Sequence, residues 1–194
     1  MQKKNCPKCA LTQRFCICLQ LHRNSNSIPV HFLVHIKEFS KSSNSARLAS
    51  LCVENTKIFL YGVYHQPMEW EKLLVGTNPM ILFPATTLKL EDACAKVPYP
   101  DPLIIPDGNW SQASKMAYKL KRLFPHLPFV TFPYNGENSV YRLREHPNPA
   151  YLSTFESMAM SLRVFQGQES YQKHMENFHI FVKNSLHMRG CLQN

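Results

Sequence analysis

The sequence contains no apolar run that approaches the ~20 residues needed to span a bilayer. Residues 1–22 are basic, but they lack the apolar segment and the small-residue cleavage site of a secretory signal. We therefore expect no membrane partner and a cytoplasmic location, where the seven cysteines stay mostly reduced. The nine histidines show no spacing typical of metal ligands, and none is assigned to a metal.

Acidic residues are scarce relative to basic ones. The chain has 13 Asp and Glu against 22 Lys and Arg, which gives a formal net charge of +9. This charge favours a polyanionic partner, nucleic acid before membrane, and the alternative is a basic protein without such a partner. A hydrophobic content of 44% is enough for a core, and 194 residues suit one domain with a small appendage.

Short apolar strands alternate with helices along most of the chain. This alternation predicts an α/β domain with a mainly parallel sheet flanked by helices. The clearest helix covers residues 110–124, where apolar side chains recur every three to four positions. Strands are predicted at 30–36, 57–63, 80–83, 103–105 and 129–132, and further helices at 45–53, 152–165 and 170–184.

Four of the seven cysteines fall in a basic N-terminal segment, residues 1–27, which we interpret as a small knuckle and linker before a main domain at 28–194. Cys6 and Cys9 form a C-x2-C pair, and Cys16 and Cys18 form a C-x-C pair. Four thiolates can complete a tetrahedral zinc shell and fold a segment too short for its own core. The alternatives are reduced cysteines that pack as small apolar groups, or an iron–sulfur or redox site.

Three of the predicted strands run directly into proline and then into polar residues. In parallel sheets, ligands bind beyond the carboxyl ends of the strands, so we expect the functional site there. The residues at these strand ends are Phe83 and Pro84, Ile105 and Pro106, and Phe132, Pro133 and Tyr134.

Asp107 and Trp110 lie where a predicted strand turns through Gly108 into a helix. A carboxylate at this position gains from helix-terminal N–H groups, and an aromatic ring beside it suits a base that must be stacked and deprotonated. The alternative is an ordinary Asp-Gly turn with a core tryptophan.

The helix predicted from residue 152 begins with a second polar cluster. Ser153 and Glu156 have the spacing of a capping box. This helix start can serve as a polar cradle for a ligand, or it can be plain capping.

Several segments resemble, in the right order, the DTW-domain family, whose signature is Asp-x-Thr-Trp followed by a short helix. The family's Thr is Asn109 here, and Asn also forms hydrogen bonds and tolerates turn conformations. The resemblance covers almost the whole chain. It rests on the cysteine knuckle and on HIKEFSKSSNSARL (35–48), ILFP (81–84), LIIPDGNWSQASKM (103–116) and YRLREHPNPAYLSTFES (141–157).

The resemblance implies a SPOUT-like catalytic domain with a trefoil knot that holds S-adenosylmethionine (SAM). It also implies transfer of the 3-amino-3-carboxypropyl group of SAM to N3 of a uridine in the variable loop of tRNA, with release of methylthioadenosine. Asp107 is then the expected base, and Trp110 shapes the pocket. SAM is expected at the strand ends named above and against Leu152, Ser153, Thr154 and Glu156.

Basic residues in or near these segments are expected to contact RNA phosphates, which set affinity and its salt dependence. Two other functions remain open: a SAM-dependent RNA methyltransferase on the same fold, and a non-catalytic RNA-binding protein. The expected RNA contacts are Arg47, Lys115, Lys119, Arg122, Arg142 and Arg144.

Overall fold

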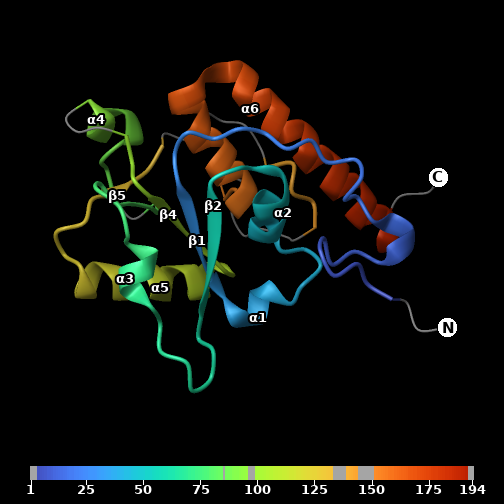
Figure 1. Ribbon diagram of the computed structural model, residues 1–194, viewed down its shortest axis with the longest axis horizontal. Coiled ribbons are helices and arrows are strands. Elements are labelled where there is room, and N and C mark those ends of the chain that lie inside the picture. Colours follow the sequence, from blue (N-terminus) through green and yellow to red (C-terminus); the bar gives the residue numbers. More distant parts are fainter. Residues whose placement is uncertain (1–3, 85, 96–98, 133–138, 144–150, 192–194) are drawn as a thin grey trace.

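A parallel sheet forms the centre of the structure, a computed structural model that describes residues 4–84, 86–95, 99–132, 139–143 and 151–191. The strand order is β2-β1-β4-β3-β5, and all four pairings are parallel. The predicted α/β class with helices flanking a parallel sheet is confirmed (Figure 1). The strands are β1 (Val30–His35), β2 (Thr56–Tyr61), β3 (Met80–Leu82), β4 (Leu103–Asp107) and β5 (Phe129–Val130).

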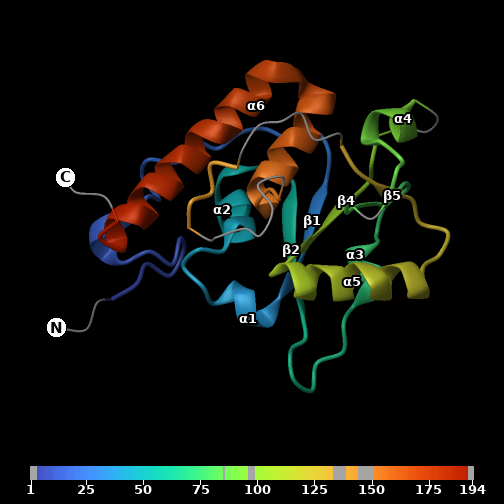
Figure 2. The same ribbon diagram turned by 180° about the vertical axis from the view of Figure 1, so that it is seen from behind.

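Helices cover both faces of the sheet, because alternate residues of its strands point to opposite sides. On one face, Val30, Phe32 and Val34 of β1 share a core with α2 (Ser45–Cys52) and α6 (Thr154–Met188). On the other face, Leu33 packs with residues of α5 (Trp110–Leu123) and α3 (Trp70–Leu73). Figure 2 shows α5 and α6 on opposite sides of the strands.

The sequence predicts a strand that begins at Leu103 and ends at Ile105, and this predicted end is wrong. Strand β4 continues to Asp107, and Pro106 lies inside it, paired with Leu33 of β1. Proline is tolerated in this central strand because the ladder with β3 stops at Ile104, so a missing N–H beyond that point costs no bond on that side. Asp107 is therefore the last residue of the strand.

Helix α6 joins the two helices that the sequence predicts at 152–165 and 170–184. It runs from Thr154 to Met188, and a kink separates its halves at Gly167, whose φ of 79° suits glycine. Helix α5 and helix α2 match their predictions within two residues. The short helices α1 (Ile36–Phe39), α4 (Leu90–Cys94) and the 3-10 turn η1 (Gln13–Phe15), like α3, were not predicted.

The cysteine knuckle packs against the far end of α6. Leu11 and Ile17 are fully buried and belong to the same core cluster as the strands. The side chain of Asn177 in α6 accepts a hydrogen bond from the His22 N–H at 2.9 Å and donates one to the His22 carbonyl at 2.7 Å. The division of the chain at residue 27 stays a prediction, but the two parts share one core.

Within the part of the chain that the structure describes, no helix is both long and apolar enough to cross a membrane.

The trefoil knot stays a prediction, since it follows from the family resemblance and not from the strand pairing.

Candidate active site

The carboxyl ends of β1 and β4 lie side by side, and β4 turns there into α5. Val34 pairs with Asp107, the last residue of β4. Asn109 then caps α5 in a reciprocal capping box with Gln112: each backbone N–H donates to the other's side-chain oxygen, at 2.7 and 2.9 Å. A Cβ on Gly108 would lie 2.8 Å from the Gln112 Cβ, so glycine is required there. The predicted strand–turn–helix is confirmed.

The capping role of Asn109 explains how it can stand where the family signature has Thr. Both residues are preferred at helix N-caps, because each offers a side-chain oxygen to the backbone N–H groups of the first turn. Thr at position 109 could therefore cap α5 in the same way.

The carboxylate of Asp107 is buried, with 6% of the residue exposed. Its Oδ2 accepts a hydrogen bond of 2.5 Å from Asn44 Nδ2, and its Oδ1 accepts one from the Thr154 hydroxyl. Asn44 is the N-cap of α2 and Thr154 is the first residue of α6. The N-termini of α2, α5 and α6 therefore meet near one carboxylate, and helix N-termini stabilise negative charge.

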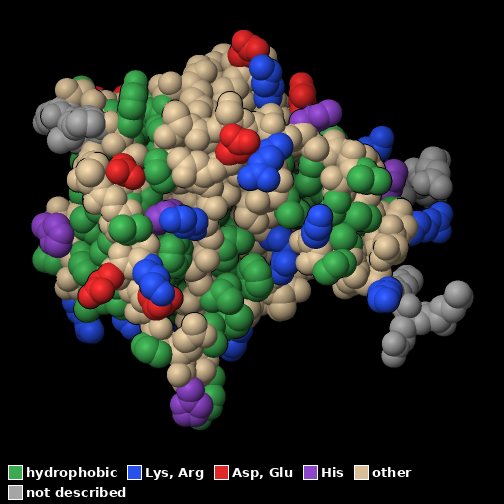
Figure 3. Space-filling view, viewed as in Figure 1, with side chains coloured by type: hydrophobic (Ala, Val, Ile, Leu, Met, Phe, Trp, Pro, Cys, Tyr) green, Lys and Arg blue, Asp and Glu red, His purple; other side chains and the backbone are tan. Residues whose placement is uncertain are grey.

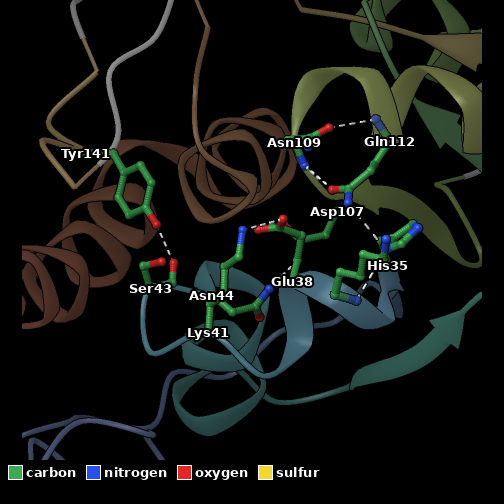
Figure 4. A network of polar contacts seen from close by, with 10 residues as sticks. His35, Glu38, Lys41, Ser43, Asn44, Asp107, Asn109, Gln112 and Tyr141 are labelled. Carbon is green, nitrogen blue, oxygen red and sulfur yellow. Dashed lines mark hydrogen bonds and ion pairs between the residues drawn. The ribbon is translucent and has the colours of Figure 1, made fainter. Parts of the chain in front are cut away.

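Asn44 has two roles at once, as Figure 4 shows for its contact with Asp107. Its Oδ1 accepts the Arg47 N–H at 2.8 Å and so caps α2, while its Nδ2 donates to the carboxylate. The neighbouring carbonyl of Ser43 accepts the Tyr141 hydroxyl. These bonds tie residues 43–47 to the carboxyl end of β4 and to the segment 139–143.

Glu156, whose contact with SAM stays a prediction, forms hydrogen bonds within the protein. Its carboxylate accepts hydrogen bonds from the Ser139 hydroxyl at 2.8 and 3.0 Å, from the Val140 N–H at 2.8 Å and from the Ser153 N–H at 2.8 Å. It therefore completes the capping box of α6 and fixes the segment around residue 139.

An aromatic stack lies at the same edge of the sheet. The Trp110 ring stacks on Tyr151 with centroids 4.3 Å apart and planes 10° apart. It also stacks on Phe83, with centroids 5.6 Å and planes 21° apart. Phe83 is 8% exposed and Trp110 is 45% exposed. The structure thus brings together Asp107, Trp110, Phe83 and Thr154 from the predicted site.

The other predicted SAM contacts differ in their exposure. Ile105 and Pro106 are both buried within β4, which corrects the expectation that the strand ends at Ile105 and that Pro106 lies beyond it. Pro84 is exposed, and Phe132 and Leu152 are half-buried. Pro133 and Tyr134 lie outside the described residues.

The predicted RNA contacts also differ in how far their side chains are exposed. Lys115, Arg122 and Arg142 are exposed, and Arg144 lies outside the described residues. Figure 3 shows Lys and Arg side chains spread over one face of the molecule, among hydrophobic ones. The Lys119 ammonium lies over the rings of Tyr61 and Trp70, at 5.4 and 5.7 Å.

Arg47 has mainly an internal role. Its guanidinium donates to the Phe39 carbonyl and lies 4.2 Å above the Phe39 ring. Partial burial lowers the pKa of Arg47 below its ordinary value. These contacts fix the α1–α2 loop, and the predicted contact of Arg47 with an RNA phosphate stays a prediction.

Sequence reasoning missed Asn44 and Tyr151. Both lie inside segments that carry the family resemblance, at 35–48 and 141–157. Their position within those segments was one signal, and Asn44 also precedes the helix predicted from residue 45, where Asn is a preferred N-cap.

The four N-terminal cysteines converge on one point. Their sulfur atoms all lie within 4.8 Å of one another, and all four cysteines are free. The sulfurs of Cys6 and Cys18 are 3.7 Å apart, and those of Cys9 and Cys16 are 3.8 Å apart. Four sulfurs at ~2.3 Å from a central zinc would be separated by about 3.8 Å. The cluster therefore fits a tetrahedral metal.

The environment of the cluster explains why a metal would matter. Burial and the neighbouring sulfurs raise the pKa of Cys18 to about 12, and burial raises that of Cys9. Backbone N–H donors around Cys9 lower the pKa of Cys6 to about 6. Four adjacent thiolates without a cation are unfavourable, and a divalent metal removes that penalty.

Comparison with known proteins gives two kinds of similarity. The family model of the DTW domain matches residues 3–186. The chain is 28% identical over 180 residues to tRNA-uridine aminocarboxypropyltransferase 2 of Macaca fascicularis, and 27% identical to the protein of the same name in Mus musculus. Each alignment covers 89% of this chain and 60% of the relative, so the chain spans little more than half the length of these relatives.

A solved structure has the same fold. The SAM-dependent rRNA:acp-transferase Tsr3 from Vulcanisaeta distributa superposes with a TM-score of 0.51 at 16% identity, covering 84% of this chain and 82% of the other.

Proposed function

We propose that this chain, which belongs to the DTW domain family, transfers the 3-amino-3-carboxypropyl group of SAM to N3 of a uridine in the variable loop of tRNA. The observation that carries the proposal is the carboxylate of Asp107, held at a strand end beside the stacked ring of Trp110. The names of the two mammalian relatives support the tRNA-uridine substrate, and the fold shared with Tsr3 supports SAM as the donor.

The reaction defines what the protein must supply. SAM provides an electrophilic carbon at the start of its amino-acid arm; the N3–C bond forms as the C–S bond breaks, and methylthioadenosine leaves. Uracil N3 carries a proton at neutral pH, so a base has to accept it. Asp107 is the proposed base, because general base catalysis requires a carboxylate fixed within hydrogen-bond reach of the proton.

The positions proposed for SAM follow from the carboxyl edge of the sheet, where parallel α/β domains bind ligands. Trp110 and Phe83 provide ring surfaces there, and Ser153 and Thr154 begin α6. The remaining proposed contacts are Pro84, Ile105, Pro106, Phe132, Pro133, Tyr134 and Leu152.

We propose that Cys6, Cys9, Cys16 and Cys18 hold a structural zinc ion, whose preferred ligand set and geometry they match. Closed four-thiolate sites leave no open position for a substrate, so this zinc would stabilise the fold and take no part in the transfer. A cytoplasmic location, where thiols stay reduced, belongs to the same proposal.

The proposed function is tested with SAM labelled separately in the methyl group and in the amino-acid arm. Arm label on a variable-loop uridine, found by mass spectrometry of tRNA, is the expected result. Methyl label on the RNA would instead identify a methyltransferase, and RNA binding without either label would identify a binding protein.

Thr154→Val is expected to lower the transfer rate about tenfold without a comparable rise in KM. The substitution keeps the side-chain volume but removes the hydroxyl that donates to Asp107 Oδ1. The carboxylate then loses one of the groups that orient it, and Thr154 acts as a positioning residue. Thr154→Ser restores the hydroxyl and should restore most of the rate in single-turnover assays; equal losses in both variants would refute the positioning role.

Lys115→Ala and Arg122→Ala are each expected to weaken tRNA binding and to reduce the slope of log affinity against log salt by about 1. Both residues are exposed on α5, the helix that begins at Trp110. Lys173→Ala is the control, because its charge is already paired with Glu169 at 2.8 Å. An unchanged slope, measured by titration at several salt concentrations, would exclude these phosphate contacts.

A further inference from the structure

The burial of Asp107 poses a question of access. Only 6% of the residue is exposed, yet a base must reach the N3 proton of the target uracil. Some group at the site therefore has to move when RNA binds. Thr154, which donates to the carboxylate, is the first residue of α6, whose start is held by the capping box of Ser153 and Glu156. Asn44 is held at the start of α2 by its own cap.

Tyr151 is a ring at this site that lies outside the regular elements and outside the buried core. It lies before the capping residue Ser153, outside any regular element. Its ring nonetheless stacks closely on Trp110, with centroids 4.3 Å and planes 10° apart. Phe83, the other partner of Trp110, is part of the buried core and cannot leave without disrupting it.

Short segments of chain connect both rings of the stack to Asp107 or to its hydrogen-bond donor. Trp110 follows Asp107 by three residues, and Tyr151 precedes Thr154 by three residues, while Thr154 donates to Asp107. Three residues span at most about 10 Å of extended chain. Each ring of the stack is thus held within three residues of Asp107 or of its hydrogen-bond donor Thr154.

We propose that Tyr151 occupies, in the RNA-free protein, the face of Trp110 on which the target uracil stacks. The inference rests on the proposed function and names the subsite for its nucleobase. Uracil and the phenol of Tyr151 each have a single six-membered ring, so one fits the space of the other, whereas the fused rings of adenine are larger. Base–aromatic and aromatic–aromatic stacking have similar strengths, so the exchange is nearly balanced.

If uracil replaces Tyr151 on Trp110, removal of the Tyr151 ring should strengthen RNA binding, whereas it should weaken binding if Tyr151 itself stacks on the RNA base. Tyr151→Ala removes the competitor and is expected to tighten binding of a short uridine-containing single-stranded RNA by about two- to tenfold, the factor that one ring–ring contact provides. Tyr151→Phe keeps a ring of the same size and should bind as the parent does.

The sequence offers a direct probe, because its two tryptophans are Trp70 and Trp110. In a Trp70→Phe background, fluorescence reports on Trp110 alone. Titration of that protein and its Tyr151→Ala and Tyr151→Phe forms with the RNA gives affinity and quenching together. Tyr118→Ala is the matched control, since Tyr118 lies on α5, as Trp110 does, but is 69% exposed. Thermal melting of each variant checks that the fold is retained.

Tighter binding and deeper quenching in Tyr151→Ala, with Tyr151→Phe unchanged, support the proposal. Weaker or unchanged binding in Tyr151→Ala overturns it, because Tyr151 would then be a platform or a structural ring. A parallel titration with SAM alone assigns the subsite: an effect confined to SAM places adenine on Trp110 and overturns the uracil assignment. The binding assay needs no turnover, so its failure is distinguishable from a failure to transfer the aminocarboxypropyl group.

Discussion

Asp107→Asn is expected to lower the transfer rate by about 100- to 10,000-fold, the usual contribution of a general base. The amide has the shape of the carboxylate but cannot accept the N3 proton. Its oxygen can still accept from Asn44, and its NH2 group can donate to the Thr154 hydroxyl, which serves as donor or acceptor. The fold and the affinity for tRNA should therefore change little.

The measurement is a single-turnover rate with arm-labelled SAM, beside a tRNA binding titration and a melting curve. Asp92→Asn is the matched control, because Asp92 is an exposed carboxylate on α4. A rate within a fewfold of the parent would show that Asp107 only supports the structure, since a lost base cannot be compensated by an amide.

Cys9→Ser is expected to remove most of the bound zinc and to lower the melting temperature by roughly 10 °C. Apparent binding free energies of structural zinc are about 10–16 kcal/mol, so loss of one ligand costs several kcal/mol, and each kcal/mol shifts the transition by about 2–4 °C in a domain of this size. The sulfur of Cys9 lies 3.8 Å from that of Cys16 and only 3% of the residue is exposed.

Elemental analysis and calorimetry check this result, and Cys191→Ser is the control, since Cys191 is exposed and outside the cluster. Zinc content equal to that of the parent would exclude Cys9 as a ligand. A lower zinc content with an unchanged melting temperature would show that the metal does not stabilise the shared core.

The sequence predicts helices and strands best where the apolar pattern is long and where capping residues mark its ends. Helix α5 has four turns of regular apolar spacing and a capping residue at its start, so its bounds differ by one residue. Strand β4 was cut short because proline usually ends a strand, whereas tertiary pairing with β1 carries it through Pro106. The four- and five-residue helices α1, α3 and α4 are too short to show a period.

In the candidate site, too, the residues linked by a local pattern were predicted, and the contacts made by long-range packing were not. Asp107 and Trp110 are three residues apart, and their turn signal is local, so both could be proposed as a pair. Asn44 reaches Asp107 across 63 positions, and Thr154 across 47. Contacts of that range depend on how helices α2 and α6 pack on the sheet, which no local pattern encodes. Family-like segments indicated the regions but not which atoms meet.

The burial of Leu11 and Ile17 against α6 limits how the protein can be shortened. A chain that began at residue 28 would expose to water the apolar surface that these two side chains cover. Two such chains would bury that surface against each other and self-associate. A fragment that keeps this surface covered must therefore retain the N-terminal segment that contains Leu11 and Ile17, whether or not that segment contacts a substrate.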